Sequence, residues 1–286
     1  MLAAINNYVQ LTKPSIMLLV IFTGTTALII EGSFLAQPLK FILVLVGLYL
    51  TGGCANALNQ YFERHLDAKM TRTRNRRPLP TGKLTPNQAL IFSTTIGFIG
   101  VALFAYFFNW LTAALALGTI LFYSLYYTLW LKPNTPQNIV IGGIAGAMAP
   151  VGAWAAATNS MAVSPWIMFL IIFLWTPPHF WALALFCKDD YKLSGLPMMP
   201  IVKGDDSTRL QIIVYSIILF FVSLTLGFFG ASWIYIITAV VLGVIFIQKA
   251  YQLYREKTDQ KARALFGFSL LYLFGLFAAI IIDGLL

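Results

Sequence analysis

Long apolar runs alternate with short polar segments along almost the whole chain. A helix needs roughly 20 apolar residues to cross the hydrocarbon core of a bilayer, and nine runs approach or exceed that length. The runs lie at 15–31, 38–61, 88–108, 110–131, 138–158, 163–187, 209–230, 232–252 and 264–284. The pattern therefore predicts an all-α, polytopic membrane protein with nine transmembrane helices.

The composition supports a fold that uses the bilayer as its solvent. Of the 286 residues, 59% are hydrophobic and only 10% are charged, against roughly 25% in ordinary soluble domains. Each apolar helix must pack against its neighbours to shelter its polar groups. We therefore expect residues 1–286 to form a single domain.

The formal net charge is +9, and the positions of the basic residues explain it. With the N-terminus in the cytoplasm, every Lys and Arg except Lys40 falls on the cytoplasmic side, as the positive-inside rule requires. The C-terminus then lies on the opposite side. The charge thus reflects topology and does not indicate nucleic-acid binding. No cleavage site follows the first apolar run, so we expect a multi-pass protein of a bacterial cytoplasmic (inner) membrane, surrounded by lipid.

Three oxygen-bearing side chains share one face where the second apolar run ends. Asn59, Glu63 and Asp67 are spaced four residues apart, and each step turns the side chain by only about 40° on a helix. Magnesium prefers carboxylates, waters and substrate phosphates as ligands. The row therefore predicts a Mg²⁺ site at the membrane surface.

A cluster of arginines follows this row directly. Arg72, Arg76 and Arg77 precede Pro78, and arginine side chains match the oxygens of a phosphate group. Carboxylates for Mg²⁺ next to arginines for phosphate are what a diphosphate site requires. The simpler alternative is a solvated helix end whose arginines only set the topology.

A second group of polar residues lies at the end of the sixth run. His179 follows Pro177 and Pro178, which are expected to break the helix, and lies about 12 Å inside the cytoplasmic end. On a continuous helix, Asp190 would share its face. An ionisable residue at that depth indicates a functional site, although a neutral histidine bonded to a neighbouring helix is the alternative.

These segments resemble the membrane prenyltransferases of the UbiA superfamily. The resemblance covers about residues 10–284, and its most specific strings are Asn75-Arg76-Arg77-Pro78, Pro177-Pro178-His179-Phe180-Trp181 and Pro197-Met198-Met199-Pro200. The second string is similar to the heme-farnesylating branch, the heme O synthases. Glu63 departs from the aspartate of the superfamily motif, and Asp-Asp-Tyr-Lys replaces its second acidic motif.

The resemblance implies a fold, a reaction and roles for particular residues. The helices are expected to bundle around a central cavity that opens to the cytoplasmic side. The enzyme would be a Mg²⁺-dependent farnesyltransferase that joins farnesyl diphosphate to a vinyl group of heme B, giving heme O and diphosphate. One or two Mg²⁺ ions are expected, and a downstream heme A synthase is a candidate partner. The implied catalytic and metal-binding residues are Asn59, Glu63, Asp67 and Asp190. The implied diphosphate-binding residues are Arg72, Arg76, Arg77, Lys132 and Lys203. His179 is expected to bind heme.

Two other functions are compatible with the sequence. A related prenyltransferase could use a different acceptor, such as a quinone precursor or a chlorophyllide. A transporter is less favoured, because transporters bind substrates near the midplane of the bilayer, whereas the charges here gather at one face.

Overall fold

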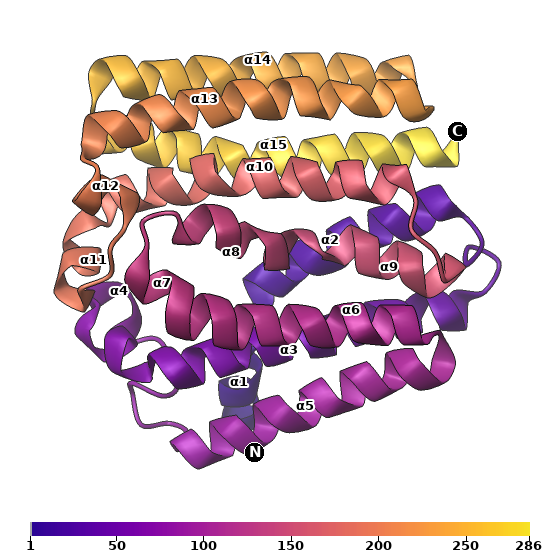
Figure 1. Cartoon of the computed structure of the whole chain (residues 1–286), viewed down its shortest axis with the longest axis horizontal. Coiled ribbons are helices and arrows are strands. Elements are labelled where there is room, and N and C mark those ends of the chain that lie inside the picture. The colour runs from indigo at the N-terminus through magenta and orange to yellow at the C-terminus, as the bar shows by residue number, and fades with distance from the viewer. Residues whose placement is uncertain (1) are drawn as a thin grey trace.

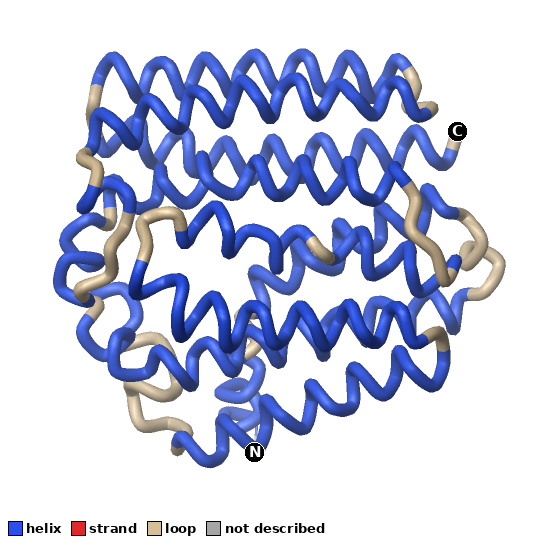
Figure 2. The backbone as a smooth tube through the Cα atoms, in the orientation of Figure 1, coloured by secondary structure: helices blue, strands red, loops and turns tan. Residues whose placement is uncertain are grey.

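The computed structural model describes residues 2–286, and within that range it contains helices and no strand (Figure 2). Nine helical segments in this range are long and apolar enough to cross a membrane. They are α2 (Pro14–Glu31), α3 (Pro38–Lys69), α5 (Pro86–Phe107), α6 to α7 (Trp110–Asn134), α8 to α9 (Asn138–Thr158), α10 (Val163–Phe186), α13 to η2 (Asp205–Phe229), α14 (Trp233–Glu256) and α15 (Asp259–Leu285). The predicted all-α membrane architecture is confirmed, and each predicted run coincides with one of these segments.

The long helices lie roughly along one direction, so the bundle has two ends (Figure 1). One end gathers four short helices, on the left in Figure 1. These are α4 (Thr71–Arg74), α7 (Lys132–Asn134), α11 (Lys188–Ser194) and α12 (Met199–Val202). We call this the basic end, formed by the links at 70–85 and 187–204 together with α7. The two long links of the sequence therefore meet in space.

Local chemistry explains where several helices begin. Pro14, Pro38 and Pro86 each occupy the start of a helix, where a missing backbone N–H costs no hydrogen bond. Thr85 caps α5 in a reciprocal arrangement, in which its hydroxyl accepts from the Gln88 N–H and its own N–H donates to Gln88.

Small residues allow the helices to approach closely. A Cβ added at Gly47 would lie 2.5 Å from the ring of Phe104, so α3 and α5 pack against each other through this glycine. Gly97 on α5 makes a similar close contact with Cys54 on α3, because a Cβ added at Gly97 would lie 2.5 Å from the Cys54 Sγ. Such contacts are typical of membrane helices, which associate largely through van der Waals packing.

The structure differs from the predicted boundaries at α3 and α10. The helix α3 continues through Asp67 to Lys69, so the row of polar side chains lies on regular helix and not in a link. The predicted break at Pro177 and Pro178 is wrong, because α10 remains helical from Val163 to Phe186. A proline removes one hydrogen bond of the ladder, and packing of the buried helix compensates for that loss.

The predicted continuous helix from His179 to Asp190 is also wrong. Cys187 leaves helical geometry with φ −109° and ψ 22°, and α11 starts in a new direction at Lys188. The angular argument that put His179 and Asp190 on one helix face therefore does not hold. The short helix α1 (Leu2–Leu11), which precedes the first span, was not predicted.

An apolar cavity of about 70 Å³ lies within the bundle. Its walls come from α2, α3, α5, α6 (Trp110–Leu121), α8 (Asn138–Ala147) and α9 (Ala149–Thr158), and they include Thr51, Phe104 and Met148. Thr51 precedes Asn59 by two turns of α3, which corresponds to about 12 Å along the helix axis. The cavity thus lies deeper in the bundle than the row of polar residues.

Candidate active site

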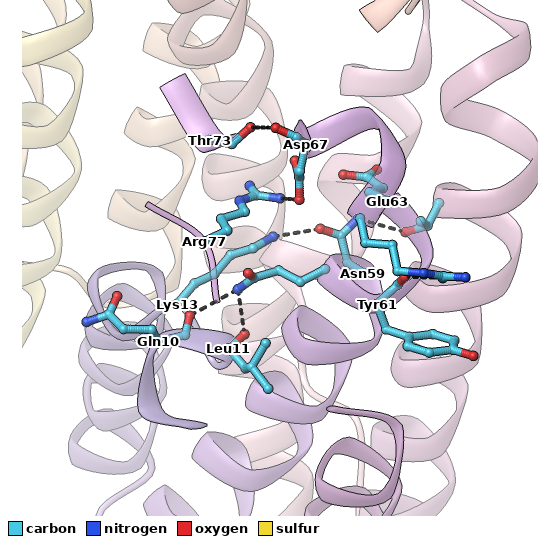
Figure 3. A network of polar contacts seen from close by, with 12 residues as sticks. Gln10, Leu11, Lys13, Asn59, Tyr61, Glu63, Asp67, Thr73 and Arg77 are labelled. Atoms are coloured by element: carbon cyan, nitrogen blue, oxygen red, sulfur yellow. Dashed lines mark hydrogen bonds and ion pairs between the residues drawn. The ribbon is translucent and has the colours of Figure 1, made fainter. Parts of the chain in front are cut away.

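The row of oxygen-bearing side chains on α3 is almost completely shielded from solvent. Asn59, Glu63 and Asp67 are 1%, 4% and 2% exposed. Their spacing along α3 puts them on one face, as the sequence predicted, and Figure 3 shows them stacked along that helix. Two carboxylates at this depth require positive partners, because an unpaired buried charge is strongly unfavourable.

Three cations from separate segments supply those partners. Arg77 donates a very short hydrogen bond to Asp67, and the Lys132 ammonium lies 2.5 Å from Glu63 Oε1. The Lys13 ammonium donates to Asn59 Oδ1 at 2.7 Å (Figure 3). The link after α3, the end of the fourth span and the start of α2 therefore converge on one face of α3.

The fourth span changes its helical geometry as it reaches this site. Residues Phe122–Leu131 form a π-helix, η1, in which the Thr128 hydroxyl donates to the Tyr123 carbonyl five residues earlier. Asn59 in turn donates to Thr128 Oγ1 at 3.0 Å. Segments of π-helix are rare and occur frequently at functional sites. Here η1 supplies Thr128 and leads directly to Lys132.

Lys13 is a site residue that sequence reasoning missed, because it was counted only as a marker of topology. It connects α1 to α2 and adopts a left-handed backbone conformation with φ 53°, which a residue with a side chain rarely adopts. The Gln60 amide stabilises this turn by donating to the carbonyls of Gln10 and Leu11, both at 3.0 Å. Burial, with the nearby Arg77 charge, lowers the pKa of Lys13 to about 7. The only sequence signal was a lone lysine before a proline at the start of a span.

Asp190 joins the two long links at the basic end. Its two carboxylate oxygens accept from the backbone N–H groups of Thr71 and Arg72, both at 3.0 Å. Although desolvation favours the neutral acid, these backbone hydrogen bonds lower the pKa of Asp190. Thr73 attaches the same link to α3 by donating to the Asp67 carbonyl at 2.8 Å (Figure 3). Asp190 thus positions the arginine-rich link through its backbone.

The remaining predicted residues lie outside this polar cluster. Arg72 and Arg76 line a neighbouring cleft, and Lys203 is exposed at the end of α12. His179 packs between α10 and α15, where its Nδ1 lies 2.6 Å from Ser269 Oγ. The imidazole ring stacks on Trp175 and Phe266, with ring centres 4.3 and 4.4 Å away. All of these contacts are with α10 and α15, and none is with α3.

Comparison with known proteins identifies the family. The model of the UbiA prenyltransferase family matches residues 18–277. This chain belongs to the UbiA prenyltransferase family. The family resemblance seen in the sequence is thereby confirmed.

Curated relatives match this UbiA family member over nearly its whole length. A protein named protoheme IX farnesyltransferase from Afipia carboxidovorans is 49% identical, and the match covers 97% of this chain and 90% of the relative. A protein of the same name from Gloeobacter violaceus is 45% identical, covering 99% and 93% of the two chains.

Solved structures share the UbiA fold at much lower identity. A digeranylgeranylglyceryl phosphate synthase superposes with a TM-score of 0.81 at 20% identity, covering 99% of each chain. A UbiA homolog from Archaeoglobus fulgidus, bound to GPP and Mg²⁺, superposes with a TM-score of 0.63 at 16% identity, covering 96% and 99%. These similarities establish the fold.

The polar cluster of this UbiA family member contains oxygen atoms of the kind that Mg²⁺ prefers as ligands. Among residues 2–286, no three His, Cys, Asp or Glu side chains are grouped closely enough to hold a metal alone. Glu63 and Asp67 offer hard carboxylate oxygens beside the amide oxygen of Asn59. Mg²⁺ is commonly held by one or two carboxylates together with water and substrate phosphates, so this donor set fits the ion.

Proposed function

We propose that this chain transfers the farnesyl group of farnesyl diphosphate to a vinyl group of heme B. Water then adds to the cation left on the porphyrin side, which gives the hydroxyl of heme O, and diphosphate is the leaving group. One observation carries the proposal: two buried carboxylates, Glu63 and Asp67, face three convergent cations at the end of an apolar bundle. The choice of heme B as the acceptor is supported by the names of relatives that share 45–49% of their residues with this chain.

The cations of the cluster bind the diphosphate and stabilise its departure. Breaking the allylic C–O bond separates a carbocation from a diphosphate anion, so catalysis requires fixed positive charge near the leaving oxygens. Lys13, Arg77 and Lys132 provide that charge from three different segments. Asn59, Asp67 and Glu63 already hold these side chains in the site before the anion arrives.

Glu63, Asp67 and Asn59 are the residues that would hold Mg²⁺ in this proposal. When bound, Mg²⁺ supplies a further positive charge that neutralises the diphosphate and assists its release. If Glu63 and Asp67 held Mg²⁺, Arg77 and Lys132 would be free to leave their present pairs and contact the phosphate oxygens. The Arg77–Asp67 and Lys132–Glu63 ion pairs would thus keep both cations in the site until the substrate binds.

The apolar cavity receives the farnesyl tail. Its volume of about 70 Å³ is far below the roughly 300–1,000 Å³ of pockets that hold drug-sized ligands, so its walls must move apart to admit the tail. The same walls exclude water from the carbocation until the acceptor attacks. The flexible side chain of Met148 and the small residues Gly146 and Gly152 line the cavity and permit that movement.

His179 orients the heme in this proposal. Its Nδ1 is bonded to Ser269, so Nε2 is the nitrogen left to approach the porphyrin or its iron. We further propose the bacterial cytoplasmic membrane as the location, with the basic end and the N-terminus in the cytoplasm, and a heme A synthase as a downstream partner.

The experiment that tests the function is an analysis of heme pigments. The protein is produced in bacterial membranes that lack heme O. The hemes are then extracted, separated by chromatography and identified by mass spectrometry. We expect heme O with the wild-type protein and none with Glu63→Gln. Glu31→Gln is a matched control, because it makes the same substitution at the end of α2, where the Glu31 carboxylate accepts hydrogen bonds from Ser33. A farnesylated quinone precursor in place of heme O would overturn the choice of acceptor.

A further inference from the structure

A second polar cleft lies at the basic end, next to the polar cluster. It has a volume of about 500 Å³. Arg72 and Arg76 line it from the link after α3, and Phe186, Cys187, Asp189 and Asp190 line it from α10 and α11. The mechanism above uses none of the side chains in this cleft.

The link presents different arginines to the two sites. The backbone N–H groups of Arg76 and Arg77 both donate to the Thr73 carbonyl, at 3.1 and 3.0 Å, so this segment forms a tight turn. Consecutive side chains on a helical turn point about 100° apart. Arg77 accordingly reaches Asp67, whereas Arg76 and Arg72, four residues earlier, line the cleft.

The guanidinium groups of the cleft arginines have no carboxylate of the described residues as a direct partner, although Asp189 and Asp190 line the same cleft. Among residues 2–286, neither Arg72 nor Arg76 forms an ion pair. Both oxygens of Asp190 are occupied by backbone N–H groups. Asp189 faces solvent and lies 3.5 Å from Lys192. The cleft can therefore attract an anion.

A third arginine approaches from α15. The guanidinium carbon of Arg263 lies 4.3 Å from the ring centre of Phe186, and the ion pairs of the described residues do not include Arg263. Burial raises the pKa of the Cys187 thiol, while the positive charges of Arg72 and Arg263 oppose that increase. Phe186 lines the cleft, so its contact with the Arg263 guanidinium brings this third arginine next to the cleft.

An aromatic path leads from the cleft into the membrane. The Phe186 ring packs edge-on against Phe266, with ring centres 5.8 Å apart, and Phe266 stacks on His179. His179 precedes Phe186 by seven residues of α10, which is about 10 Å along the helix. Charged groups at the surface and aromatic rings below them match a flat, apolar molecule that carries carboxylates on one edge.

We propose that Arg72, Arg76 and Arg263 bind the carboxylate groups of the acceptor in this cleft. The inference rests on the proposed function, in which the acceptor is heme B. Heme B carries its two propionates on one edge of the macrocycle, and an arginine can bind a carboxylate through two parallel hydrogen bonds. With the propionates at the basic end, the rest of the macrocycle lies along Phe186 and Phe266. This assignment gives Arg72 and Arg76 a role different from the diphosphate binding expected from the sequence.

The test compares heme B with its dimethyl ester, which lacks free carboxylates. The purified full-length protein in lipid nanodiscs is titrated with each compound, and binding is followed by the heme absorbance. We expect heme B to bind the wild type more tightly than the ester. Arg76→Gln and Arg263→Gln should each weaken heme B binding about threefold to fivefold, and the double variant about tenfold or more. None of these changes should alter ester binding or the KM for farnesyl diphosphate.

Arg74→Gln is the matched control, because it removes the same charge from the same link without lining the cleft. It should bind heme B normally. A raised KM for farnesyl diphosphate with unchanged heme binding would overturn the proposal and assign the cleft to diphosphate. Unchanged affinity for both substrates in the double variant would also overturn the proposal. Formation of heme O by the wild type tests the proposed function separately from these results.

Discussion

Lys132 and Glu63 are separated by 69 residues in the sequence, yet the lysine ammonium lies 2.5 Å from the carboxylate. Their side chains are 16% and 6% exposed, so the pair is shielded from solvent. The π-helix η1 leads to Lys132, which contacts the face of α3 that carries Asn59, Glu63 and Asp67. This contact joins the second and fourth membrane spans at the proposed site.

The first prediction concerns that pair. Removing one partner of a buried ion pair leaves an uncompensated charge and typically costs ~3–5 kcal/mol. Lys132→Gln should therefore lower the thermal stability of the protein in detergent and abolish turnover. The double variant Lys132→Gln with Glu63→Gln should recover stability without recovering turnover. A double variant less stable than either single variant would contradict the pairing.

A second prediction concerns Lys13. Its ammonium reaches Asn59 from the turn between α1 and α2. Lys13→Gln should raise the KM for farnesyl diphosphate about tenfold, as the loss of one charge-assisted hydrogen bond predicts, and should leave heme affinity unchanged. Steady-state kinetics with Lys40→Gln as a control would check this. Normal kinetics for Lys13→Gln would exclude Lys13 from the diphosphate site.

His179 leads to a third prediction. We expect His179→Ala to lose heme farnesylation and to alter the heme absorbance spectrum, while farnesyl diphosphate still binds. Ser269→Ala leaves the ring in place and removes only its partner at Nδ1, so it should reduce turnover less. If His179→Ala is poorly folded and loses affinity for both substrates together, the ring serves only to pack α10 against α15.

The orientation of the bundle is a fourth prediction. A tag inserted at the link 75–77 should be accessible only from the cytoplasm, because that link carries several arginines. A tag after Leu286 should be accessible only from the other side, because seven spans, an odd number, lie between that link and Leu286. Labelling of both tags from the same side would show that the number of spans is even.

Local periodicity was enough to predict much of this structure. Apolar run length located the nine spans, since the bilayer sets the length of each helix. The spacing of Asn59, Glu63 and Asp67 predicted one polar face, because a helix fixes the angle between residues four apart. The curated relatives and the family model confirm the family that the motifs indicated.

Features that depend on long-range contacts could not be predicted in this way. The left-handed turn at Lys13 depends on Gln60, 47 residues later, which bonds the carbonyls before it. The residue types of η1, many of them aromatic, do not predict that this segment forms a π-helix instead of an α-helix. Arg76 and Arg77 are adjacent in the sequence, and only the folded turn shows that Arg77 contacts Asp67 whereas Arg76 lines the neighbouring cleft.

In the proposed mechanism, Glu63 and Asp67 hold the Mg²⁺ that assists the departure of the diphosphate leaving group. The most direct measurement is diphosphate release and heme O formation by purified protein in nanodiscs, before and after chelation of Mg²⁺. We predict that chelation stops both products, that added Mg²⁺ restores both, and that Asp67→Asn forms neither at any Mg²⁺ concentration. Equal rates of heme O formation by wild type and Asp67→Asn, with or without chelator, would contradict the account.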